Sequence, residues 1–108
     1  MFDLKSVEKA VRYLADTDES CAMAKARVTA GKERLKTTLA VCFLDAPGSS
    51  VRERDAEALS SKGYRDAVEE YADAIADYET MHNKRVRAIL QVDIWRSVNS
   101  AKAKGVMT

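Results

Sequence analysis

The stretch from Tyr64 to Lys104 constrains the fold most, because it reads as one uninterrupted helix. It contains neither Pro nor Gly over 41 residues, and side chains suited to a helix seam recur in it at heptad spacing. The first series is Tyr64, Tyr71, Tyr78, Arg85 and Val92, and the second, three residues further on, is Ala67, Ala74, Met81, Ala88 and Trp95. A helix of this length would extend roughly 60 Å, so it must pair lengthwise with a partner helix.

A second heptad pattern upstream supplies that partner. One series is Cys21, Val28, Leu35 and Cys42, and the positions three later hold the small residues Ala24, Gly31 and Thr38. We predict a helix over 18–45 that pairs antiparallel with the helix over 64–104, with small residues facing the tyrosine rings. The bases of 25–36 would then lie beside the acids of 66–79, which favours this orientation.

Local patterns predict two shorter helices. Leu4, Val7, Val11 and Leu14 step by three and four, which indicates one apolar stripe on a helix over 3–15. Asp3 or Ser6 is suited to cap it, and the polar run 16–19 is typical of the start of the next helix. Ser50 and Glu53 have capping-box spacing, which predicts a helix over 51–60. The run 60–63 predicts a break, with a continuous helix through Gly63 left open.

We therefore expect an all-α fold in a single domain, residues 1–108. It would be an antiparallel, coiled-coil-like helical hairpin, with the short N-terminal helix packed near the far end of the helix over 64–104 and a short connecting helix. Residues 97–108 should fray into a basic tail. Six large apolar side chains spread around the helix so widely that one neighbour cannot bury them, which predicts a homodimer through this end. They are Val86, Ile89, Leu90, Val92, Ile94 and Trp95.

Composition limits the classes of function. The chain has 18 Lys and Arg against 17 Asp and Glu, a net charge of +1, so it has no global bias toward nucleic acid or membrane. It has no membrane-spanning apolar run and no secretion signal at its N-terminus, which predicts a cytoplasmic protein. Cys21 and Cys42 would lie too far apart on one helix to form a disulfide, and we expect free thiols.

Catalytic patterns are weak. Glu79 and His82 form a Glu-x-x-His pair, the unit that di-iron bundles use twice, but Glu79 falls just off the seam. Cys21 and His82 are too far apart for a nucleophile and base, and the glycines follow no phosphate-binding pattern. We expect no enzyme activity, no metal, no cofactor and no small-molecule substrate.

Two surfaces are candidates for binding. The C-terminal part of the long helix carries the residues that we assign to a partner or to nucleic acid: Arg85, Arg87, Trp95, Arg96, Lys102 and Lys104. Arg85 falls on the seam, so an acid of the N-terminal helix or a second subunit must pair with it, or it marks a binding site. The alternative for this surface is a solvated helix end whose cations sit favourably near the C-terminus.

The other candidate surface is acidic. It is a stripe that could imitate nucleic acid, made by Asp66, Glu69, Glu70, Asp73 and Asp77. The neighbouring rings of Tyr64, Tyr71 and Tyr78 have two readings, a stacking platform for single-stranded nucleic acid or core packing in the seam.

Four segments carry a resemblance to known proteins. They are YLADTDE, VRERDAEALSSKGYRD, YADAIADYETMHNKR and IWRS, and they span Tyr13 to Ser97. In this order they resemble a group of small helical proteins encoded by tailed bacteriophages, often among early recombination and replication genes. The group has no established chemistry, so the resemblance assigns no functional residue. It implies a phage or prophage origin and an accessory role in the bacterial host.

Three hypotheses of function follow. The first is a non-catalytic, dimeric protein–protein interaction module in phage DNA recombination or replication, whose partner is a phage or host protein, with DNA contact left open. The second is an anti-defence inhibitor of a host enzyme or defence complex that acts through the acidic stripe. The third is direct binding of single-stranded nucleic acid.

Overall fold

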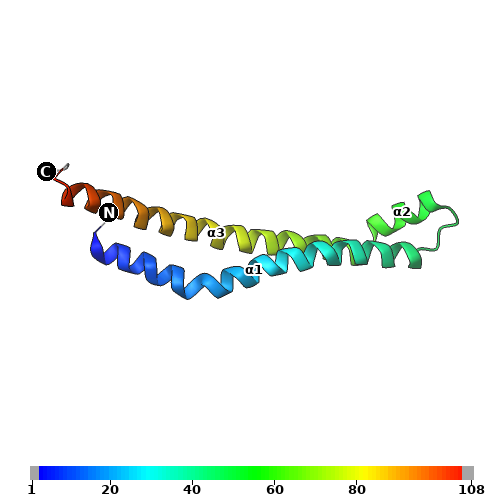
Figure 1. The fold of residues 1–108 in the computed structure, drawn as a ribbon. Coiled ribbons are helices and arrows are strands. Elements are labelled where there is room, and N and C mark those ends of the chain that lie inside the picture. The colour runs from blue at the N-terminus through cyan, green and yellow to red at the C-terminus, as the bar shows by residue number, and fades with distance from the viewer. Residues whose placement is uncertain (1–2, 106–108) are drawn as a thin grey trace. The chain divides into compact units, whose positions relative to one another are not determined.

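The computed structural model describes residues 3–105 and contains three helices and no strand in that range. They are α1 (Leu4–Asp45), α2 (Val51–Ser60) and α3 (Lys62–Ala103) (Figure 1). Contacts divide the chain into two compact units, and α1 and α3 contribute to both. We call residues 1–22 with 79–108 the terminal unit, and residues 23–78 the central unit. The all-helical class predicted from the sequence is confirmed.

The prediction of a separate N-terminal helix over 3–15 is wrong, because α1 runs without a break from Leu4 to Asp45. Thr17, in the expected gap, is helical, and its hydroxyl donates a hydrogen bond to the Tyr13 carbonyl 2.7 Å away. Asp3 caps the helix, since its carboxylate accepts a hydrogen bond from the Ser6 amide at 2.8 Å. That bond lowers the pKa of Asp3 below its usual range.

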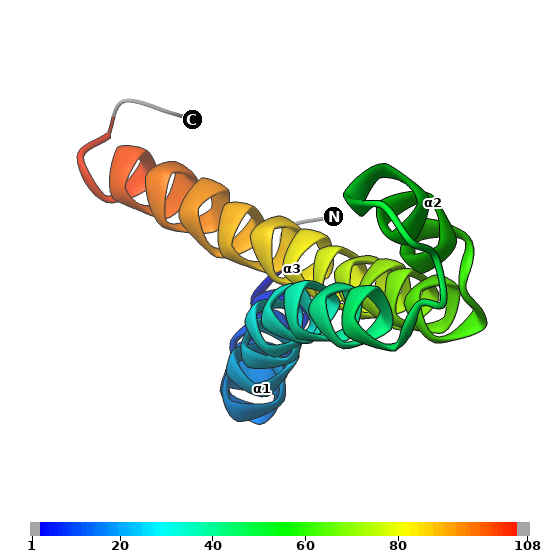
Figure 2. The ribbon, with the colours of Figure 1, turned by 90° about the vertical axis from the view of Figure 1, so that its right-hand side faces the viewer.

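The helix α2 has the bounds that the sequence predicts, and its N-cap is confirmed. The Ser50 hydroxyl accepts a hydrogen bond from the Glu53 amide at 3.1 Å, whereas the Glu53 carboxylate accepts from the Ser49 amide rather than from Ser50. Arg54 attaches α2 to the end of α1, because its guanidinium donates to the Leu44 carbonyl at 3.0 Å and lies over the Phe43 ring. Figure 2 shows α2 on one side of the helix pair that it connects.

The break before α3 is real but shorter than expected. Ser61 alone separates α2 from α3, with an extended backbone (φ −70°, ψ 150°), and Gly63 lies inside α3. At the other end, the expected frayed tail over 97–108 is wrong for 97–103, which belong to α3. Gly105 follows the helix with φ +71°, a conformation that glycine adopts without strain. Residues 106–108 lie outside the described range.

In the central unit α1 and α3 pair antiparallel, as predicted. A Cβ atom added at Gly31 would lie 3.2 Å from Cδ1 of Tyr71, and one added at Gly63 would lie 3.4 Å from Sγ of Cys42. Residue numbers rise along α1 while those of the neighbouring α3 residues fall, which is the antiparallel arrangement. The Tyr71 ring packs over Gly31. The close approach at Gly31 offsets its cost in a helix interior, which is about 1 kcal/mol relative to Ala.

In the terminal unit the start of α1 pairs with the end of α3. Arg85 donates to the Leu14 carbonyl at 2.7 Å, and the Ser20 hydroxyl lies 3.7 Å from Sδ of Met81. The N-terminal segment therefore packs against the far end of the long helix, as predicted, although it does so as part of α1.

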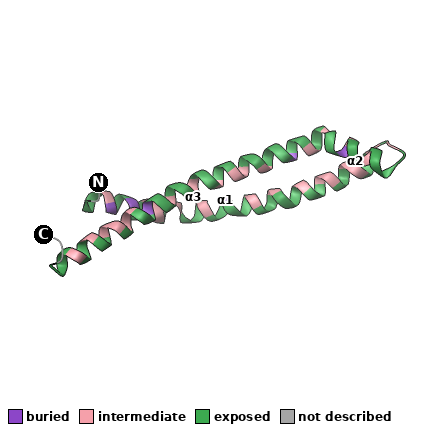
Figure 3. Cartoon of the chain, turned by 90° about the horizontal axis from the view of Figure 1, so that it is seen from above, coloured by how far each residue is buried: buried purple, intermediate pink, exposed green. Residues whose placement is uncertain are grey.

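The buried side chains of the described range are all small. They are Val7, Ala10, Ala24, Ala58, Ala67 and Ala88 (Figure 3). The predicted N-terminal stripe is only half right, since Val7 is buried and Leu14 half-buried while Leu4 and Val11 are exposed. Counting the heptad back from Cys21 puts Ala10 and Thr17 on the seam instead of Val11. Many large apolar side chains thus stay in contact with solvent.

Candidate interaction surface

Arg85, the first of the candidate cations, serves the packing of the terminal unit. Its side chain is 17% exposed, and its Nη1 donates to the Leu14 carbonyl at 2.7 Å and to the Thr17 hydroxyl at 2.6 Å. Its Nη2 lies 3.4 Å from the Asp18 carboxylate. The acid is Asp18, which the sequence placed at the start of the helix over 18–45 and not in the expected N-terminal helix, and two neutral acceptors accompany it. With its donors engaged across the helix pair, Arg85 is not placed to contact a ligand.

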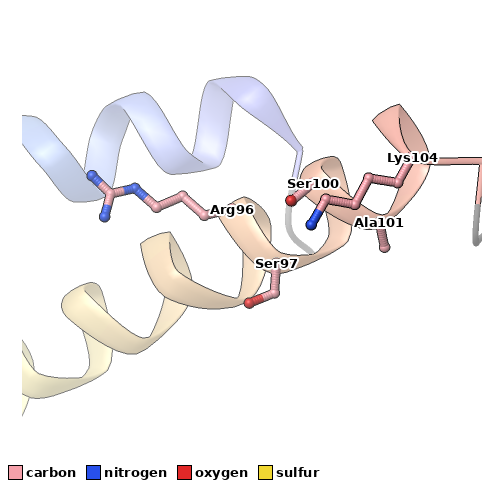
Figure 4. A pocket seen from close by; sticks show the side chains of 5 residues that line it. All are labelled: Arg96, Ser97, Ser100, Ala101 and Lys104. Carbon is pink, nitrogen blue, oxygen red and sulfur yellow. The ribbon is translucent and has the colours of Figure 1, made fainter.

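The other candidate cations are exposed on α3 or directly after its last residue. Arg87, Arg96, Lys102 and Lys104 all lie in the terminal unit with their side chains in solvent. A shallow hollow on α3 is lined by Arg96, Ser97, Ser100, Ala101 and Lys104 (Figure 4). In Figure 4 the Arg96 guanidinium points back along α3, away from Lys104, so the two charges do not converge on one point. The hollow offers a spread positive surface rather than a pocket for a single anion.

Apolar side chains are exposed beside these cations. Val86, Ile89 and Leu90 are each 46–56% exposed, which confirms that one neighbouring helix does not bury this part of α3. Trp95 and Val92 are half-buried at seam positions. Val86 and Leu90 are four residues apart and Ile89 is three from Val86, so the three side chains are neighbours on the helix surface. Together they form an apolar area next to a positively charged one.

The acidic stripe lies in the central unit. All five of its carboxylates, on Asp66, Glu69, Glu70, Asp73 and Asp77, are exposed. Glu70 pairs with Arg34 of α1 at 2.9 Å, and Asp66 pairs with Lys62 at 2.7 Å. These exposed pairs each contribute a few tenths of a kcal/mol. They also reduce the negative charge that the stripe presents, which weakens its likeness to nucleic acid.

The tyrosine rings lie at the helix pairing rather than in open solvent. Tyr64, Tyr71 and Tyr78 are half-buried, as core packing predicts. Across residues 3–105 no three His, Cys, Asp or Glu side chains form a group that could hold a metal ion. Cys21 and Cys42 are free thiols on α1. Within the same range, the helices lack an apolar segment that could span a membrane.

Leu4 and Val11 are surface residues that were not predicted as such, because their spacing in the sequence also fits a buried stripe. The heptad phase set by Cys21 and Val28 would have placed both just off the seam. In comparisons with known proteins, no family model, no curated protein and no solved structure matches this chain.

Proposed function

We propose that the chain is a non-catalytic helical interaction module that binds a protein surface through Val86, Ile89 and Leu90 of α3. One observation carries the proposal: these three large apolar side chains are neighbours on the helix and are about half exposed. Contiguous exposed apolar side chains bordered by charge are typical of protein-binding surfaces. The neighbouring cations Arg87 and Arg96 would form the polar rim of such an interface.

The setting that we propose is phage DNA recombination or replication, where the chain would act as a dimeric scaffold for a phage or host protein. The support for this setting is the resemblance of the segments between Tyr13 and Ser97 to small helical phage proteins. Binding through a helix face needs no catalytic group, and the proposal assigns none.

A matched pair of variants tests the binding role. Leu90→Lys places a charge in the apolar area, and Leu44→Lys makes the same change at a leucine that is 69% exposed in the central unit. Both variants should stay helical by circular dichroism, since both side chains are exposed. Tagged protein is recovered from bacteria that carry the phage, and the co-purifying proteins are identified. We expect a protein that copurifies with the wild type and with Leu44→Lys and is lost with Leu90→Lys. Equal recovery with both variants would contradict the proposal.

DNA is a second candidate ligand, favoured by the exposed cations Arg87, Arg96, Lys102 and Lys104. Contacts between cations and phosphates release counterions, so binding should weaken steeply as salt rises. Arg96→Gln and Lys104→Gln should each reduce the slope of log affinity against log salt by about one. A gel shift that is insensitive to salt, or no shift at low salt, would exclude this ligand.

A further inference from the structure

We propose that Arg85 sets the register in which α1 and α3 pair, a role that goes beyond the proposed function. Register here means which residue of α1 lies opposite a given residue of α3. Arg85 occupies a seam position of the terminal unit, and its side chain is 17% exposed. A polar side chain at one seam position of a coiled coil specifies register, at a cost in stability. Such a residue matters most where the rest of the seam accepts more than one register.

The seam of the central unit does not distinguish registers that are one heptad apart. On α3 it carries a tyrosine at every seventh residue, and on α1 it carries a small residue at every seventh residue. The tyrosines are Tyr64, Tyr71 and Tyr78, and the small residues are Ala24, Gly31 and Thr38. Gly31 lies against Tyr71. After a shift of seven residues Gly31 would meet another tyrosine, and Tyr71 would meet another small side chain.

The ion pair between the helices of the central unit accepts the same shift in one direction. Arg34 of α1 pairs with Glu70 of α3 at 2.9 Å. Asp77 is exposed and lies seven residues after Glu70, so a shift of one heptad brings a carboxylate to the place of Glu70. Because α1 and α3 are each one continuous helix, a shift along the central unit also shifts the pairing in the terminal unit.

The surroundings of Arg85 distinguish these registers. Its guanidinium donates to the Thr17 hydroxyl at 2.6 Å and lies 3.4 Å from the Asp18 carboxylate. Neither acceptor recurs one heptad away on α1. The corresponding residues are Ala24 and Lys25 in one direction and Ala10 and Val11 in the other. A shift would leave the guanidinium in the seam without these acceptors, and in one direction beside a second cation, which is costly for a charge largely removed from water.

The connection between the helices is the competing source of register. Arg54 attaches α2 to the end of α1 through the Leu44 carbonyl at 3.0 Å, and Ser61 alone separates α2 from α3. A shift of one heptad moves α3 by about 10 Å along α1, so this hydrogen bond would break. That bond is exposed, whereas the bond from Arg85 to Thr17 is part-buried. Loss of the less exposed bond costs more, so we expect Arg85 to dominate.

Fluorine NMR of the single tryptophan measures the register. Trp95 is half-buried at a seam position, so a chain labelled with 5-fluorotryptophan gives one resonance for each register. The wild type should show one resonance. Arg85→Leu should show at least two, in proportions that do not depend on protein concentration, which separates a shift from self-association. Its Tm should not fall, because Thr17 keeps its bond to the Tyr13 carbonyl and Asp18 is 83% exposed.

Three further variants sharpen the test. Arg65→Leu makes the same change at an exposed position of α3 and should keep one resonance. Arg54→Gln removes the anchor of α2 and should also keep one, since Arg85 remains. Ala24→Thr combined with Lys25→Asp copies the two acceptors one heptad along α1, so it should add a second resonance although Arg85 is unchanged.

A single resonance for a helical Arg85→Leu chain would overturn the inference, because the register would then not depend on Arg85. A second resonance for Arg54→Gln would overturn it in favour of the connection. If Arg85→Leu does not fold, the variant with copied acceptors decides, and a single resonance from that chain in its helical state would overturn the inference as well.

Discussion

Replacing Thr17 by Val tests whether Arg85 is a structural residue. The Thr17 hydroxyl donates to the Tyr13 carbonyl at 2.7 Å and accepts from Nη1 of Arg85 at 2.6 Å. Valine keeps the shape and the β-branch and removes both bonds. Thr37→Val is the matched control, because the Thr37 hydroxyl makes the same bond within α1, to the Glu33 carbonyl at 3.1 Å, and is exposed. The difference between the two variants isolates the contact with Arg85.

The expected size follows from the surroundings of Arg85. A hydrogen bond to a charged group contributes about 1.5–3 kcal/mol. The Arg85 side chain is 17% exposed and keeps its bond to the Leu14 carbonyl, so water partly replaces the lost acceptor. We therefore expect the lower end, about 1.5 kcal/mol, from Thr17→Val. Thr37→Val should change the free energy of unfolding by less than about 0.5 kcal/mol, as surface substitutions usually do.

Thermal unfolding followed by circular dichroism at equal protein concentration measures the difference. An unfolding entropy of about 2.1 cal/mol/K per residue converts 1.5 kcal/mol into a drop in Tm of about 7 °C for this length. Thr17→Ser keeps the hydroxyl and should recover most of the loss. If Thr17→Val lowers Tm no more than Thr37→Val does, the hydrogen bond between Arg85 and Thr17 contributes nothing to stability. That result would refute the structural role assigned here to this contact.

Three further predictions concern the helix pairing and the caps. Gly31→Leu should lower the free energy of unfolding, measured in urea, by about 1–2 kcal/mol, because crowding of the Tyr71 ring outweighs the gain in helix propensity. An unchanged midpoint of the urea transition would mean that the ring moves aside freely. Ser50→Ala should lower the free energy of unfolding by about 1 kcal/mol in the same assay, since it removes the oxygen that caps α2. An unchanged free energy would show that the cap is dispensable. The hydrogen bond from Ser6 lowers the pKa of Asp3 in the folded chain, so its contribution is complete above the unfolded value and is lost as pH falls through the folded one. The difference in Tm between the wild type and Asp3→Ala should therefore vanish in acid, and a difference that persists there would contradict the cap.

The phage setting and the binding surface that we propose rest on different observations. The setting rests on four segments of the sequence, whereas the surface rests on the half-exposed side chains of Val86, Ile89 and Leu90. Either proposal can therefore fail without the other.

The amino-acid sequence by itself determined that the chain is helical, where α2 lies, and how α1 and α3 pair in the central unit. Heptad spacing through Tyr71 and Gly31 fixed the seam, since matching periods and complementary sizes allow antiparallel pairing. The cap at Ser50 and the turn before it fixed α2, because these signals act over a few residues and need no distant partner. The capping signal is local, and the heptad pattern repeats often enough to specify a long contact between two helices.

Only the tertiary structure decided whether α1 is one helix and which apolar side chains remain exposed. The residues around Thr17 suit a helix start as well as a helix interior, and packing against Arg85 favours the continuous helix. Val11 and Ala10 both fit a stripe on a short helix. Because α1 is one continuous helix, the heptad register of its central part also applies to its first turns. That register places Ala10 on the seam and leaves Val11 in solvent. A short apolar pattern does not fix its own phase, because phase depends on the neighbour against which a helix packs.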